Sequence, residues 1–247
     1  MFKFYSILLL YICLISCKKN CTIYTDDESI FGIDVSHYQD DKESIKWDKV
    51  MQNTNPKIDF VYIRTTMGKN GSDNSFKQNI IELEKLNIPF GVYHYFRPNE
   101  LAIEQFENFK IHNNKFGKLP IAVDVEEKSN FSTKIFKKEL RKFLELIEKE
   151  YNTKPIIYSP QKFFNLYLWQ DFKDYKFWIA RQHGIKTIPK NNTPGKTPNL
   201  LSFKCPVIWQ YSGTGNVSGI NSKVDLNITS KSIFENQLSI ASQQIHH

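Results

Sequence analysis

From about residue 30 onward, short apolar runs alternate with longer amphipathic segments. The runs that predict strands are Ile30–Val35, Ile58–Arg64, Ile88–Phe96, Leu119–Val125, Lys154–Ser159, Lys176–Ala180, Pro206–Tyr211 and Lys223–Leu226. The segments that predict helices are Asn74–Leu86, Ala102–Asn113, Ser132–Tyr151 and Pro160–Leu168. Alternation of strands and helices at this spacing is typical of βαβ units, which build a parallel sheet covered on both faces.

The last third of the chain departs from this alternation. Between Ala180 and Pro206 the sequence is polar and rich in Pro, Gly and Lys, and no helical pattern separates the final strands. Long connections of this kind are usually functional or disordered. We therefore predict an α/β fold, an irregular TIM-like barrel with about five βα units followed by helix-poor strands. It forms one domain over residues 30–240.

The first residues carry a targeting pattern instead of a folded element. Met1–Ser16 has a lysine near its start and then an apolar run too short to span a bilayer, as in a signal peptide. Leu14–Cys17 resembles a lipobox, so we expect removal of residues 1–16, lipidation of Cys17 and a polar tether over 17–29. The protein would then be secreted across the inner membrane and lipid-anchored in the cell envelope, in either membrane. The alternative is an ordinary signal peptide that ends in Cys by chance.

Composition changes this picture little. Lys and Arg number 33 against 26 Asp and Glu, a formal charge of +7, but the basic residues are scattered and form no nucleic-acid motif. We expect a monomer with no nucleic-acid partner. Cys205 is the one cysteine in the folded region, so no disulfide framework or zinc site is indicated. A buried, inert thiol is the favoured interpretation of Cys205, and a bridge to Cys21 is the alternative.

Candidate chemistry first appears in the run I-A-V-D-V-E-E, Ile121–Glu127. Side chains alternate along a strand, so Asp124 and Glu126 point the same way, with Cβ atoms about 7 Å apart, while Glu127 points to the opposite face. In a half-buried cleft one of the two pKa values should rise, which gives a proton donor beside a carboxylate that stays ionised. Glycoside hydrolysis needs such a pair. The alternative is a solvated acid pair at a strand end.

Other strand ends carry acids and aromatic residues. Asp34 follows the first apolar run and Asp225 lies in the last, so closure of the barrel would bring them together across the mouth from Asp124 and Glu126. Aromatic rings stack on the apolar faces of sugars, so a ring of them around acids predicts a glycan groove; otherwise these aromatics belong to the core. The candidate substrate-binding residues on these strands are His94, Tyr95, Tyr158, Trp178, Trp209 and Gln210.

Together these segments are similar to the Chalaropsis-type lysozymes, glycoside hydrolase family 25. The resemblance rests on eight blocks in the family's order, from about residue 31 to 227. They are G-I-D-V-S-H-Y-Q (Gly32–Gln39), F-V-Y-I-R-T-T-M-G (Phe60–Gly68), G-V-Y-H-Y-F-R-P (Gly91–Pro98), P-I-A-V-D-V-E (Pro120–Glu126), P-I-I-Y-S-P (Pro155–Pro160), W-I-A (Trp178–Ala180), W-Q-Y-S (Trp209–Ser212) and V-D-L-N (Val224–Asn227).

The resemblance implies an irregular barrel and an endo-acting muramidase, free of metal or cofactor. Its substrate is the β-1,4 bond between N-acetylmuramic acid and N-acetylglucosamine in peptidoglycan. Motif by motif, it implies that Glu126 is the general acid and Asp124 its partner. It also implies that Asp34 and Asp225 are the other acids of the site, which hold the substrate or tune the charge.

The resemblance also matches Tyr95 and Tyr158 to substrate-facing tyrosines. Two departures matter. The second block often ends in an acid before its glycine, where this chain has Met67, and after W-I-A the family often shows an aromatic, where this chain has Arg181–His183. No role is assigned to Met67, and the far edge of the groove stays open.

Mechanism and alternatives remain open from sequence alone. The spacing of Asp124 and Glu126 lies between retaining and inverting geometries. We hypothesise a substrate-assisted, net-retaining route in which Asp124 orients the sugar's own amide. One alternative is a non-catalytic peptidoglycan-binding lipoprotein on the same barrel. Another is a metal-dependent cell-wall deacetylase, whose metal candidates would be His37 and His94 with Asp34.

Overall fold

The computed structural model describes residues 29–187, 194–202 and 204–235 of the chain. Its sheet runs in the order β1-β9-β8-β7-β6-β5-β4-β2-β3, and an added β1–β2 pairing closes eight of the strands into a barrel. The strands are β1 (Ser29–Val35), β2 (Phe60–Met67), β3 (Gly71–Ser72), β4 (Phe90–Tyr95), β5 (Ala122–Asp124), β6 (Ile156–Pro160), β7 (Lys176–Ala180), β8 (Ile208–Gly215) and β9 (Val224–Ser230). The predicted strands are thus confirmed, and the short hairpin strand β3 was not predicted.

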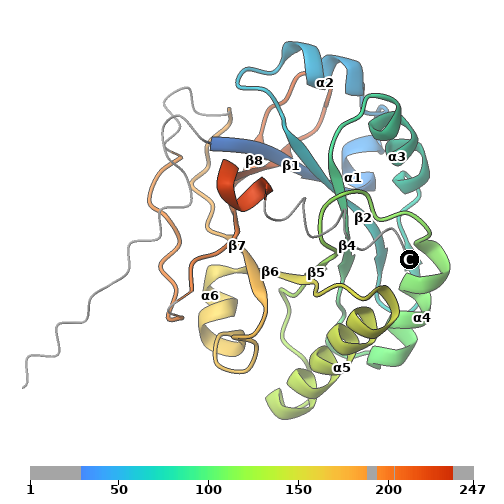
Figure 1. The fold of residues 1–247 in the computed structure, drawn as a ribbon, viewed down its shortest axis with the longest axis vertical. Helices are drawn as coiled ribbons and strands as arrows, with labels where there is room; N and C mark the ends of the chain where they lie inside the picture. Colours follow the sequence, from blue (N-terminus) through green and yellow to red (C-terminus); the bar gives the residue numbers. More distant parts are fainter. Residues whose placement is uncertain (1–28, 188–193, 203, 236–247) are drawn as a thin grey trace, which may run out of the picture.

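Helices lie around the outside of the barrel (Figure 1). They are α1 (His37–Asp40), α2 (Trp47–Asn53), α3 (Phe76–Lys85), α4 (Ala102–His112), α5 (Thr133–Tyr151), α6 (Gln161–Phe163) and the π-helix η1 (Phe164–Leu168). Each of β1, β2, β4, β5 and β6 is followed by a helix, whereas the described residues between β7 and β9 contain none. The prediction of five βα units followed by helix-poor strands is confirmed; α1 and α2 were not predicted.

The longest helix, α5, shows why the amphipathic pattern was a reliable signal. Ser132 caps its N-terminus by accepting a hydrogen bond from the backbone N–H of Ile135, and Asn152 ends it in the left-handed conformation. Its apolar positions are all buried against the barrel: Phe136, Leu140, Phe143, Leu144 and Ile147. Because tertiary burial of one face supplies most helical stability, this stripe fixes where α5 packs.

The last strand runs against its neighbours. β1, β2 and β4 to β8 pair in parallel around the barrel, and the short β3 is antiparallel to β2. β9 is antiparallel to both β8 and β1. The start of β9 therefore lies at the barrel end where the parallel strands finish. Asp225, the second residue of β9, therefore lies at this same end of the barrel.

Two apolar clusters fill the molecule. One lies between the strands and the helices, and the other fills the barrel interior with Phe60, Tyr62, Leu119, Ala122, Ile156, Tyr158, Trp178, Ala180 and Ile208. Gly32 permits this interior packing because a Cβ there would lie 2.3 Å from the ring of Phe60. Every second residue of a strand faces the barrel interior. The last interior-facing residue of each parallel strand therefore lies at the mouth of the barrel.

Several predictions concern residues outside the described part. The signal peptide (1–16), the lipidated Cys17 and nearly all of the tether (17–29) lie there.

Cys205 lies within the described residues. It is disulfide-bonded, so its interpretation as a free buried thiol was wrong. Across the described residues, no helix has the length and apolar character needed to cross a membrane.

Candidate active site

A cavity of about 220 Å³ opens at the barrel mouth, and four acids from distant parts of the chain line it. Asp34 comes from the end of β1, Asp124 from the end of β5, Glu126 from just beyond β5, and Asp225 from the start of β9. The structure therefore brings together all four acids that the sequence singled out. Their convergence in one half-closed cavity is the central feature of the site.

Asp34 and Asp225 form one carboxyl pair. They are directly opposite each other in the antiparallel register of β1 and β9, and their carboxyl groups interact by a hydrogen bond. Burial raises the pKa of Asp34 to about 6, against the lowering effect of its hydrogen bonds with Asn227 and Gln210. Burial and the charge of Asp34 raise the pKa of Asp225 to about 8. At neutral pH this pair holds a proton, mainly on Asp225.

Asp124 and Glu126 form the second pair. Burial and the neighbouring charge of Glu126 raise the pKa of Asp124 well above its ordinary value. Burial also raises the pKa of Glu126, although its hydrogen bond with Asp124 works against this. The expectation that only one of the two values rises was wrong, because both carboxyls are desolvated. One oxygen of Asp124, Oδ1, is buried without a hydrogen-bond partner.

A chain of hydrogen bonds holds Asp34 in place. Its Oδ2 accepts from Gln210 Nε2 at 3.0 Å and from Asn227 Nδ2 at 2.7 Å. Gln210 in turn accepts from the hydroxyl of Tyr158 at 2.9 Å, and Asn227 accepts from the indole N–H of Trp178 at 2.8 Å. The two aromatic residues thus fix the orientation of both amides, and the amides present donors to Asp34.

Aromatic rings form much of the remaining cavity wall. Tyr158 and Trp178 meet edge to face with ring centroids 4.8 Å apart, and Tyr93 and Tyr95 add two more rings. The hydroxyl of Tyr95 donates to Glu127 at 2.6 Å. Of the predicted substrate-binding residues, Tyr95, Tyr158, Trp178 and Gln210 line the cavity. Tyr93 also lines it and was missed as a site residue.

Two predicted substrate-binding residues, His94 and Trp209, do not line the cavity. His94 is fully buried and its ring nitrogens contact Thr66 Oγ1 at 2.7 Å and Gln105 Oε1 at 3.2 Å; burial lowers its pKa to about 3. Trp209 is fully buried and donates to the carbonyl of Arg181 at 3.0 Å. Both predictions were wrong because neighbouring residues on a strand face opposite ways. Where Tyr93, Tyr95 and Gln210 face the cavity, His94 and Trp209 must face the outer layer.

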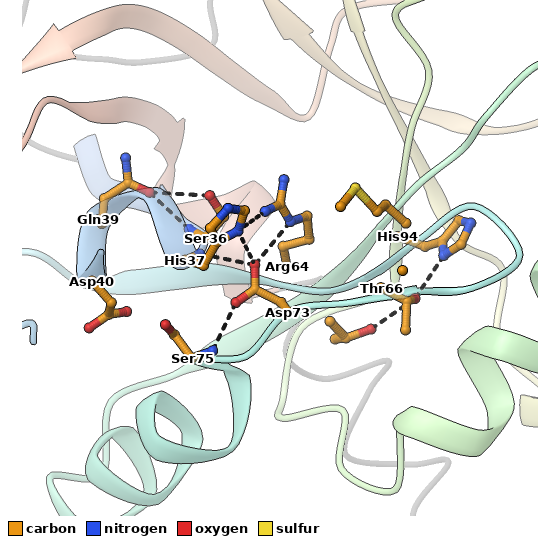
Figure 2. Close-up of polar contacts among 12 residues, drawn as sticks. Ser36, His37, Gln39, Asp40, Arg64, Thr66, Asp73, Ser75 and His94 are labelled. Carbon is orange, nitrogen blue, oxygen red and sulfur yellow. Dashed lines mark hydrogen bonds and ion pairs between the residues drawn. The ribbon is translucent and has the colours of Figure 1, made fainter. Parts of the chain in front are cut away.

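Arg64 is a further site residue that sequence reasoning missed. It is 7% exposed and lines the cavity beside Asp124. Figure 2 shows how it is held: Nε donates to Asp73 Oδ2 at 3.0 Å, and Nη2 contacts His37 Nδ1. Its positive charge lowers the pKa of Asp124. The period-two row of Phe60 and Tyr62 continues to position 64, and that alternation was the signal that could have found it.

Of the three residues proposed as metal candidates, His37 and His94 have other partners, whereas Asp34 lines the cavity. The backbone N–H of His37 donates to Asp73 at 2.9 Å, and its ring faces Asp73 and Arg64. His94 lies in the outer layer. Within the described ranges, no group of three or more His, Cys, Asp or Glu is arranged to hold a metal ion. The two histidines that the deacetylase alternative requires therefore point to other partners.

Comparison with known proteins places this geometry in a family. The profile described as Glycosyl hydrolases family 25 matches residues 33–220. The chain is 32% identical to the uncharacterized protein YegX of Escherichia coli (85% of this chain, 72% of that protein) and 27% identical to Lysozyme M1 of Streptomyces globisporus (82% and 68%).

The fold is also similar to a solved structure. A family 25 glycosyl hydrolase from Bacillus anthracis matches with a TM-score of 0.70 and 28% identity, over 86% of this chain and 95% of that one. Profile, relatives and fold agree with the resemblance seen in the sequence blocks. The chain belongs to glycosyl hydrolase family 25 and is a glycoside hydrolase.

Proposed function

We propose that this protein is an endo-acting muramidase. It hydrolyses the β-1,4 bond between N-acetylmuramic acid and N-acetylglucosamine in peptidoglycan. The observation that carries the proposal is the pairing of two desolvated carboxyls, Asp124 and Glu126, in an aromatic-walled cavity that also contains Asp34 and Asp225. Family membership and the similarity to Lysozyme M1 support the choice of substrate.

Glu126 is the proposed general acid. The two carboxyls interact and burial raises both pKa values, so the pair keeps a proton to higher pH than an ordinary carboxyl does. A hydrogen bond from substrate to Asp124, together with the charge of Arg64, favours the ionised form of Asp124 and leaves the proton on Glu126. Glu126 then protonates the leaving oxygen as the glycosidic bond breaks.

Asp124 is proposed to orient the sugar's acetamido group. Its Oδ1 is buried and unpartnered, and a buried acceptor of this kind is costly unless substrate supplies a donor. The acetamido N–H is such a donor. The acetamido oxygen then attacks the anomeric carbon as the leaving group departs, and water opens the cyclic intermediate while Glu126 takes its proton. Two displacements give net retention.

The experiment that tests the function is fragment analysis of digested peptidoglycan. Purified sacculi are treated with the protein, reduced with borohydride, and examined by mass spectrometry. Muropeptides that end in reduced muramic acid are expected. Ends in reduced glucosamine, or loss of acetyl groups without chain cleavage, would refute the proposal. The first anomer formed, followed by NMR, separates retention from inversion, and an inverted product would exclude the substrate-assisted route.

We also propose a location for the enzyme, since the N-terminal pattern predicts cleavage before Cys17 and lipid anchoring in the cell envelope. Cleavage removes Cys13, and a thioether occupies the sulfur of Cys17. Cys21 is therefore the proposed partner in the disulfide of Cys205. Cys17→Ala should move the protein from the membrane fraction to the soluble fraction, and unchanged membrane attachment would contradict lipidation.

A further inference from the structure

A second hollow of about 420 Å³ adjoins the catalytic cavity and is called the side pocket here. It is lined by the loop that follows β4, by the end of β2 and by three residues that also line the catalytic cavity: Tyr38, Arg64 and Tyr95. Shared walls make the two spaces neighbours. A group attached to a sugar in the catalytic cavity can therefore reach into the side pocket.

The side pocket carries fixed hydrogen-bond donors. Arg64 lines both spaces, and its guanidinium is held by Asp73 at Nε and by His37 at Nη2. Arg97 has weaker anchors: Nη1 lies 3.4 Å from Glu100 and Nη2 lies 3.5 Å from the sulfur of Met67. A thioether is a weak acceptor, so Arg97 keeps capacity for a stronger partner.

Each carboxylate of the pocket accepts one short hydrogen bond. Glu127 accepts from the Tyr95 hydroxyl at 2.6 Å, and Glu100 accepts from the backbone N–H of Lys69 at 2.5 Å. A carboxylate can accept several hydrogen bonds, so Glu100 and Glu127 keep acceptor capacity beside the donors of Arg97. A pocket with both donors and acceptors suits a peptide, which carries N–H groups as well as carbonyl and carboxylate oxygens.

The proposed substrate contains such a group. N-acetylmuramic acid differs from N-acetylglucosamine by a lactyl ether, and in peptidoglycan this lactyl group carries a short peptide with free carboxylates. We propose that the side pocket binds this peptide stem, with Arg97 and Arg64 as donors to its carboxylate and carbonyl oxygens. The inference rests on the proposed function and deepens it, because it assigns peptide-bearing glycan as the preferred substrate.

The decisive experiment compares two batches of the same glycan strands. One batch keeps its stems, and the other has lost them to an amidase that cuts the lactyl–peptide bond. We expect the full chain to show a kcat/KM roughly tenfold higher on peptide-bearing strands, the factor that one charge-assisted hydrogen bond provides. Arg97→Gln should lower this ratio to near one, and Arg97→Lys should restore part of it.

Lys110→Gln is the matched control. Lys110 is exposed, pairs with Glu150 and lines neither hollow. Lys110→Gln removes one positive charge, as Arg97→Gln does, but away from the side pocket. The ratio for Lys110→Gln should equal that of the wild type. A similar fall in both variants would reduce the effect to overall charge and overturn the proposal.

A binding measurement separates recognition from turnover. In the Glu126→Gln background, calorimetry with muramoyl dipeptide and with N-acetylmuramic acid should show that Arg97→Gln weakens the dipeptide roughly tenfold and changes sugar binding little. Equal weakening of both ligands would overturn the proposal.

The two proposals fail in different ways. If neither batch of strands yields reducing-end muramic acid, the muramidase function itself is wrong. If both batches are cut with equal kcat/KM, or if the preference follows strand length instead of peptide content, only the peptide pocket is wrong.

Discussion

Asp34 and Asp225 are paired directly opposite each other where β1 meets the antiparallel β9, with their carboxyl groups sharing a hydrogen bond. Two like charges in that position repel, and Asp34 is also buried, so the pair ionises with difficulty. Ionisation of both carboxyls therefore lowers the free energy of unfolding, because the fold holds them close together. Strain of this kind is typical of active sites.

This pair makes stability depend on pH. Its unfolded pKa lies near 4, and the folded pKa of Asp225 is about 8. Below pH 4 both states hold the proton; between pH 4 and 8 only the folded state does, so raising the pH lowers stability. Asp225→Asn removes this titration and should stabilise the protein by a few kcal/mol at pH 8 and little at pH 4. Calorimetric unfolding across that range measures it; a difference independent of pH would contradict it.

Activity should depend steeply on the proton of Glu126. Glu126→Gln keeps the shape of the side chain but carries no acidic proton, so we expect the rate of strand cleavage to fall by about 10²–10⁴. Glu84→Gln is the control, since Glu84 is a surface residue whose partner is Lys115. Reducing-end release from purified peptidoglycan measures both variants. An active Glu126→Gln enzyme would remove Glu126 from its assigned role.

Much of the fold was predictable because the signals were local. Burial of one helix face and alternation along strands fixed the α5 stripe and the barrel strands, and acids directly after apolar runs marked Asp34, Asp124 and Glu126. The direction of β9 was not readable, because an antiparallel last strand has the same apolar pattern as a parallel one. Barrel closure alone was the reason for placing Asp225 beside Asp34. The antiparallel direction of β9, which brings the start of that strand to the mouth, was not part of the prediction.

The errors within the site have one physical cause. His94 and Trp209 were chosen for residue type, although strand alternation turns them toward the outer layer. The same alternation would have selected Tyr93 and Arg64. What the sequence could not supply is the partner of Arg64: Asp73 arrives from a loop beyond β3, and only the folded chain brings it within 3.0 Å.

The orientation of Asp34 should depend on Trp178. Trp178→Phe removes the indole N–H that holds Asn227, so a buried amide oxygen loses its donor and Asn227 can turn away from Asp34. We expect a loss of about 1–3 kcal/mol in stability together with a several-fold fall in activity. Trp209→Phe is the contrast. It also loses an indole hydrogen bond, a partly buried one to the carbonyl of Arg181, but position 209 faces away from the cavity. Equal losses of activity per folded molecule in both variants would contradict this assignment.

Arg64 should set the acid limb of the pH–rate profile. Its guanidinium lowers the pKa of Asp124. The proposed mechanism requires Asp124 as the carboxylate. Arg64→Gln removes the charge, so the acid limb should move to higher pH by roughly one unit. The change also leaves Asp73 buried without its ion partner, which costs about 3–5 kcal/mol, so rates are normalised to folded protein.

Arg64→Lys separates the electrostatic role from packing. Lysine keeps the positive charge but cannot reproduce the two-sided contact with Asp73 and His37. The Lys variant should therefore lose stability while its acid limb stays near that of the wild type. If the profiles of Arg64→Gln and wild type coincide when compared at equal folded fraction, Arg64 is a structural residue only, and the ionised state of Asp124 must come from the substrate alone.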